Sequence, residues 1–99
     1  MAVRTDTEMT VAEAAYKHDL AYEAWRDGRK AIEVRRAAEI TKLENAVTAA
    51  ADPAEHAAAY TAWLMGRKTI EATVKAEITE LENAVIAAAR DLNAAKAAA

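Results

Sequence analysis

The sequence predicts an all-α fold, a long antiparallel helical hairpin, on three observations. Of the 99 residues, 29 are alanine, two are glycine and one is proline, so long stretches contain no helix breaker. The large apolar residues recur at helical spacing, and no stretch alternates as a strand would. A strong reversal signal, Asp52-Pro53, stands near the middle of the chain.

The chain repeats itself at an offset of 38 residues. Residues 21–50 align without gaps to residues 59–88, and 20 of these 30 positions are identical. The identities include large side chains, so alanine richness alone does not explain them. A tandem duplication is the simplest explanation, and we expect residues 1–99 to form a single helical domain built from the two copies.

The large apolar residues of each copy form a stripe along one helical face. Steps of three, four and seven residues keep the stripe in phase, and the 11-residue spacing of Trp63, Val74 and Val85 is typical of a straight or slightly right-handed coil. We expect the stripe to be a helix–helix interface with aromatic anchors. Its residues are Tyr22, Trp25, Ile32, Ile40, Leu43, Val47, Tyr60, Trp63, Ile70, Val74, Ile78, Leu81 and Val85.

Capping signals indicate the two expected helix starts. Thr10-Val11-Ala12-Glu13 is a capping box, and Thr5-Asp6-Thr7-Glu8 is an equally good one slightly earlier. Asp52-Pro53-Ala54-Glu55 combines a capping aspartate, a proline at the first helical position and a glutamate at the third. The signals predict helices over about residues 10–51 and 53–97, with a turn near 51–53.

A four-helix bundle is the alternative fold. Gly28 and Gly66 would then break each copy, and Asp27-Gly28 is a common turn dipeptide. The hairpin is favoured because the apolar stripe stays in phase across both glycines, and one glycine costs a helix only about 1 kcal/mol.

Two histidines are the candidate metal or haem ligands. His18 and His56 have the spacing to lie on the apolar face, and in a four-helix bundle they could approach as axial ligands. In a hairpin they would be roughly 45 Å apart by helix rise. Because neither has a partner at Glu-x-x-His or His-x3-His spacing, we expect packing histidines and no cofactor, with a haem or metal carrier as an alternative function.

A basic band covers residues 26–36 of the first copy. It contains Arg26, Arg29, Lys30, Arg35 and Arg36. The second copy has Leu64, Thr73 and Val74 in place of three of these arginines. We expect a solvated face or a band of ion pairs between subunits, while a small regulatory protein that binds an acidic partner or nucleic acid through the band is a further alternative.

The composition argues against several function classes. Serine and cysteine are absent, no glycine-rich phosphate loop exists, and the glutamates lie off the apolar stripe, so we expect no enzyme. A net charge of −3 gives no bulk attraction for nucleic acid or an anionic membrane. No apolar run approaches the roughly 20 residues that span a bilayer, and the polar first eight residues do not resemble a signal peptide.

These properties predict a soluble chain that works by assembly. Alanine provides little area to bury, so one chain has only a thin core and leaves apolar surface for itself or for other protein helices. We therefore expect a non-enzymatic structural or scaffolding subunit, cytoplasmic or within a larger particle such as a phage virion or a secretion filament. We expect no nucleic acid, membrane or small-molecule substrate as partner.

Overall fold

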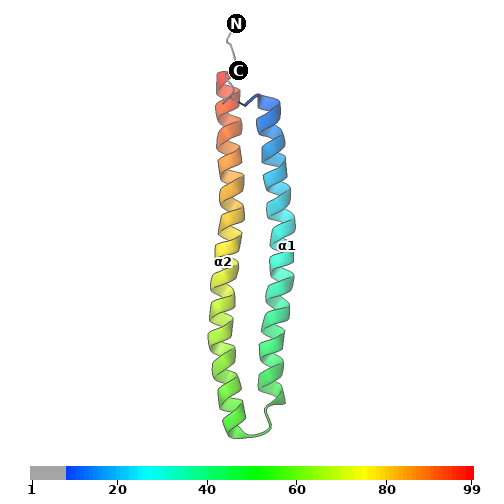
Figure 1. The fold of residues 1–99 in the computed structure, drawn as a ribbon, viewed down its shortest axis with the longest axis vertical. Helices are drawn as coiled ribbons and strands as arrows, with labels where there is room; N and C mark the ends of the chain where they lie inside the picture. Colours follow the sequence, from blue (N-terminus) through cyan, green and yellow to red (C-terminus); the bar gives the residue numbers. More distant parts are fainter. Residues whose placement is uncertain (1–8) are drawn as a thin grey trace. The chain divides into compact units, whose positions relative to one another are not determined.

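The computed structural model describes residues 9–99, and this part of the chain consists of two helices. Helix α1 covers Val11–Ala49 with 39 residues, and α2 covers Pro53–Ala98 with 46 residues. Figure 1 shows the single chain reversal between them, and no strand occurs in the described part. The all-α helical hairpin is therefore confirmed, with each predicted helix end within two residues of the observed one.

Both helices run without interruption through their glycines. Gly28 lies inside α1 and Gly66 inside α2, and neither has a positive φ angle. The four-helix alternative with breaks at these glycines is therefore wrong. Packing against the other helix offsets the modest helix penalty of a single glycine.

Side-chain caps start both helices at the predicted residues. The Thr10 hydroxyl accepts a hydrogen bond from the Glu13 amide at 3.1 Å. The Asp52 carboxylate accepts one from the Glu55 amide at 2.8 Å, and the Glu55 carboxylate in turn accepts one from the Ala51 amide at 3.0 Å. These bonds satisfy amides that a helix start leaves without an intrahelical partner. The competing capping box at residues 5–8 lies outside the described residues.

The chain divides into two compact units, and each contains a segment of both helices. The first unit comprises the residues up to Gly28 together with Thr79–Ala99, and the second comprises Arg29–Ile78. Within each unit a segment of α1 packs against a segment of α2. The single helical domain over residues 1–99 stays a prediction.

A glycine marks a close approach between the helices in each unit. A Cβ atom at Gly28 would lie 2.9 Å from Cδ1 of Leu81, and one at Gly66 would lie 2.8 Å from Cδ1 of Leu43. Each glycine therefore leaves room for a leucine methyl group of the other helix. The two contacts involve equivalent residues, because Gly66 and Leu81 lie 38 positions after Gly28 and Leu43.

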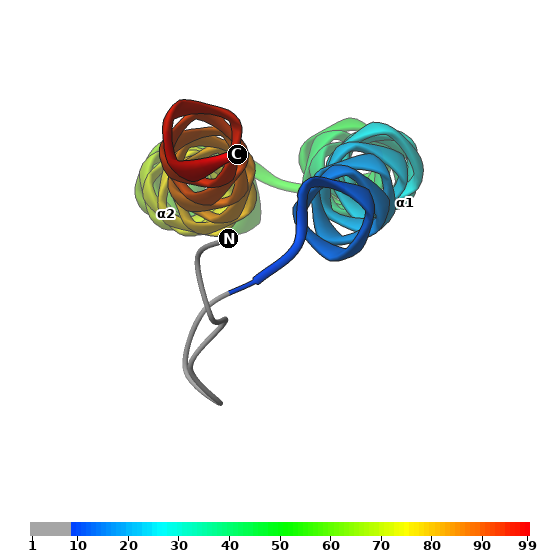
Figure 2. The same cartoon turned by 90° about the horizontal axis from the view of Figure 1, so that it is seen from above.

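The buried core is thin. Among the described residues, Ala14, Ile32, Val74 and Ala95 are the buried apolar residues, with exposed fractions of 0 to 8%. Two of these four are alanines, and no large side chain is fully buried. Each helix segment has a single helix beside it, as the view along the helices shows (Figure 2). The side of each helix turned away from its neighbour therefore has no helix packed on it within the described part.

Removing the α2 cap tests the assigned helix start. Asp52→Ala leaves the Glu55 amide without its acceptor. We expect the free energy of unfolding to fall by about 1 kcal/mol. Asp52→Asn keeps an acceptor and serves as the control. Urea unfolding followed by circular dichroism measures both variants, and equal losses for alanine and asparagine would contradict the cap.

A second test concerns the close approach at Gly66. Gly66→Val forces a branched side chain against Leu43. We expect this overpacking to lower the free energy of unfolding by about 1–3 kcal/mol. Leu43→Ala makes room for the new side chain, so the double variant should lose less than the sum of the single variants. Leu81→Ala is the matched control, since Leu81 faces Gly28, and its loss should simply add to that of Gly66→Val.

Candidate functional site

A shallow, mainly apolar groove lies between α1 and α2 in each unit. The first groove, in the first unit, has a volume of about 320 Å³, and the second groove, in the second unit, about 260 Å³. Both are open to solvent. The first groove is lined by Tyr22, Trp25, Glu82, Val85 and Ile86, and the second by Tyr60, Trp63, Glu44, Val47 and Thr48.

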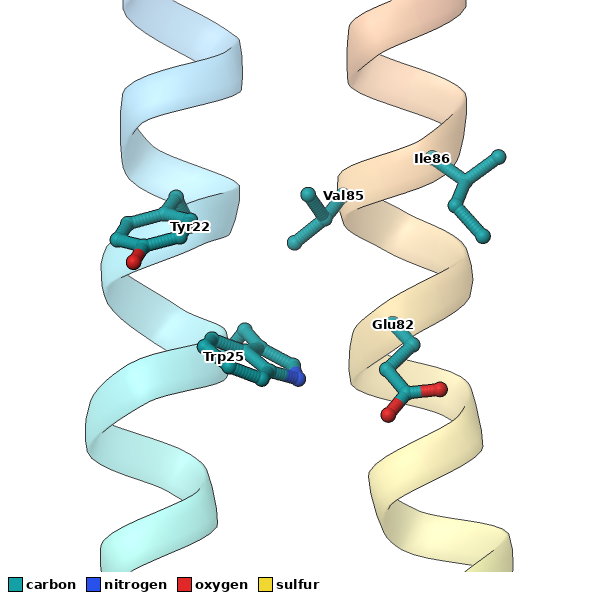
Figure 3. Close-up of a pocket in the computed structure, with 5 residues that line it drawn as sticks. All are labelled: Tyr22, Trp25, Glu82, Val85 and Ile86. Atoms are coloured by element: carbon teal, nitrogen blue, oxygen red, sulfur yellow. The ribbon is translucent and has the colours of Figure 1, made fainter.

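The two grooves are built from equivalent residues. Every lining residue of one groove lies 38 positions from a lining residue of the other, and four of the five pairs are identical. The fifth pair is Ile86 in the first groove and Thr48 in the second. Figure 3 shows that Trp25 and Val85 both point into the space between α1 and α2, while Ile86 points away from α1. The repeat therefore produces the same surface feature once in each unit.

Aromatic pairs form one wall of each groove. The ring centroids of Tyr22 and Trp25 are 5.6 Å apart, and those of Tyr60 and Trp63 are 5.7 Å apart. These separations are typical of favourable ring contacts. The guanidinium of Arg67 lies 5.3 Å from the ring of Trp63, a cation–π geometry. The arrangement holds the indole of Trp63 in place from two sides.

The indole nitrogen of Trp63 is buried without a hydrogen-bond partner. Burying an unpaired N–H costs stability, so the apolar area of the ring, and not its polar atom, favours this position. Trp63 as a whole remains half-buried. A side chain of this kind acts as a packing anchor within the unit and leaves part of its face to solvent.

The predicted stripe lies mostly on the inner faces of the helices. Ile32 and Val74 are buried, and nine other stripe residues are half-buried. These nine are Trp25, Ile40, Leu43, Val47, Trp63, Ile70, Ile78, Leu81 and Val85. Tyr22 and Tyr60 differ, since each is 48% exposed at the edge of its groove. The stripe therefore packs α1 on α2 within each unit, and its tyrosines extend it to the surface.

The two histidines lie in different units. His18 is half-buried in the first unit, with Nδ1 3.8 Å from the Asp19 carboxylate. His56 lies in the second unit, and its side chain is exposed. It stands in the first turn of α2, next to the reversal, where α1 has already ended. Among residues 9–99 no cluster of three or more histidine, aspartate or glutamate side chains has the geometry to bind a metal ion.

The basic band forms ion pairs within its own chain. Arg35 Nη2 lies 2.5 Å from a carboxylate oxygen of Glu77, and Arg36 Nη2 lies 2.5 Å from one of Glu71. These hydrogen bonds, assisted by the attraction of the carboxylates, raise the pKa of both guanidinium groups. Arg26 contacts its neighbour Asp27 at 3.2 Å. The partners of Arg35 and Arg36 are glutamates of the second copy, which the sequence analysis did not identify.

Comparisons with protein families, with curated proteins and with solved structures found no significant match. No helix in the described part combines the length and apolarity that a bilayer crossing requires. The candidate site is therefore defined by its geometry alone. It consists of two equivalent apolar grooves, each lined by an aromatic pair and a glutamate.

Substitutions of Trp63 distinguish what its apolar ring contributes to stability from what its indole N–H group contributes. Trp63→Ala should cost about 3 kcal/mol, the lower end of the range for large core aromatics, because the ring is only half-buried. Trp63→Phe should cost much less, since it keeps ring area and removes the buried N–H group without a partner. Urea unfolding provides both free energies. A phenylalanine variant as unstable as the alanine variant would mean that the indole N–H contributes to stability.

Proposed function

We propose that the chain is a non-enzymatic structural subunit that acts by helix–helix assembly. The observation that carries this proposal is the exposure of large apolar side chains in both grooves. Tyr22 and Ile86 line the first groove, and Tyr60 lines the second, each about half exposed. A further helix that covered these side chains would bury area that the thin core of one chain does not supply.

In the second unit this surface continues along α2. Leu64 follows Tyr60 by four residues, so the two side chains are neighbours on the helix surface. Leu64 is 47% exposed and replaces the arginine that the first copy has at the equivalent position. Isolated apolar side chains are common on protein surfaces, but apolar residues gathered beside an aromatic groove are typical of interfaces.

Two other functions remain hypotheses. One is a haem or metal carrier that uses His18 and His56, and the other is a small regulatory protein that binds through the basic band at residues 26–36. No observation favours either of them. The histidines belong to different units, and Arg35 and Arg36 already contact glutamates of their own chain.

A charge placed beside the second groove tests the proposal. Leu64→Arg introduces the residue of the first copy at an exposed position, so folding should be unaffected while a helix docked on the groove would have to bury a charge. We expect the mass in solution, measured by sedimentation equilibrium, to fall relative to the unmodified chain.

The matched control is Met65→Arg. Met65 is the adjacent residue on α2 and is 67% exposed, but it follows Tyr60 by five residues and so, unlike Leu64, is not its neighbour on the helix surface. It should leave the mass unchanged. An unmodified chain that remains a monomer at all concentrations would overturn the proposal. An equal fall in mass for both variants would overturn the assignment of the interface to the groove.

A further inference from the structure

An apolar ridge lies on the surface of α1 in the first unit. It consists of Tyr16 and Leu20, which are 65% and 46% exposed and are neighbours along the helix because they are four residues apart. Rows of side chains at this spacing form the ridges that pack into grooves of other helices. Ala54 and Ala58 occupy the equivalent positions of α2, so the second copy has no such ridge.

The second groove provides a matching apolar surface. Its Tyr60 is 48% exposed, and Leu64, one turn later on α2, is 47% exposed. The first copy has Arg26 at the position equivalent to Leu64, so a tyrosine followed by a leucine flanks the second groove and not the first. Each chain therefore has the ridge in its first unit and this apolar groove in its second unit.

The charges of the two surfaces are complementary. Lys17 precedes Leu20 by three residues and is therefore its neighbour on α1, while Glu44 lines the second groove. Within residues 9–99, neither Lys17 nor Glu44 has an ion-pair partner. Arg67, the cation next to this groove, lies over the ring of Trp63 instead. The carboxylate of Glu44 is thus available to a cation from another chain.

We propose that the partner in assembly is a second copy of this chain, and that its ridge docks in the second groove with Lys17 beside Glu44. This inference rests on the proposed function and names the partner and the surface. In a twofold dimer the ridge of each chain enters the second groove of the other, so the same contact forms twice. The pairing covers the ridge and the flank of the groove, whose large apolar side chains a single chain leaves about half exposed or more.

Arg26 disfavours the first groove as the docking site. Both grooves contain a glutamate, so the carboxylates alone do not select one of them. In the first groove, Arg26 follows Tyr22 by one turn and would lie near the docked Lys17. Like charges opposed across an interface disfavour pairing, and covering the guanidinium costs desolvation energy. Leu64 at the equivalent position of the second groove adds apolar area instead.

Removal of the ridge tests this pairing in the full chain. Tyr16→Ala/Leu20→Ala introduces the residues of the second copy at exposed helical positions, so both helices should be retained. We expect the dissociation constant of the dimer, measured by sedimentation equilibrium, to rise at least tenfold. The matched control is Val34→Ala. Val34 is 72% exposed on α1, lies outside the ridge and also has an alanine, Ala72, as its equivalent in the second copy.

Charge reversal identifies the two sides of the contact. Lys17→Glu brings two carboxylates together in each contact and Glu44→Lys brings two ammonium groups together, so each variant alone should dissociate about tenfold more readily. In a mixture, one chain of each variant forms a dimer in which both contacts again pair opposite charges. The mixture should therefore regain the mass of the unmodified protein. Glu82→Lys, the equivalent change in the first groove, is the control and should leave the mass unchanged.

The outcomes separate this inference from the proposed function. An unmodified chain that is a monomer at every concentration overturns both. An oligomer that persists without the ridge, or reversed variants that remain as dissociated in the mixture as alone, overturn the pairing of ridge and groove and leave the proposed assembly intact. An equal fall in mass for Glu82→Lys and Glu44→Lys would overturn the assignment of the ridge to the second groove.

Discussion

The packing of the helices depends on a leucine methyl group that lies against a glycine with no side chain. This contact occurs once in each unit, at Gly28 with Leu81 and at Gly66 with Leu43. Because the backbones approach closely there, a tryptophan one turn earlier on the glycine helix has no room directly between the helices. Trp25 and Trp63 instead form the walls of the grooves beside the contact. The thin core and the exposed aromatic edges are thus two consequences of one close approach.

Much of the fold follows from local signals in the sequence. The caps at Thr10 and Asp52 act within four residues of a helix start, so their spacing alone predicts where α1 and α2 begin. The continuity of both helices follows from the phase of the apolar stripe. The role of the glycines was not predictable in this way, because the leucine that each one accommodates belongs to the other copy of the repeat.

The electrostatic contacts also could be predicted only in part from the sequence. The contrast between Arg35 and Arg36 in the first copy and Thr73 and Val74 in the second is visible in the sequence. The glutamate partners of Arg35 and Arg36 are 42 and 35 residues away, respectively, and only the packing of the two helices identifies them. The exposure of His56 likewise depends on where α1 ends, and helical periodicity does not indicate that position.

We propose that a chain with this thin core depends on association with other chains. The most direct test is urea unfolding of the unmodified chain at several protein concentrations. If unfolding is coupled to dissociation of a dimer, each tenfold increase in concentration adds about 1.4 kcal/mol to the apparent stability, and the midpoint rises. A midpoint that does not change with protein concentration would show that the chain is stable alone and does not depend on association.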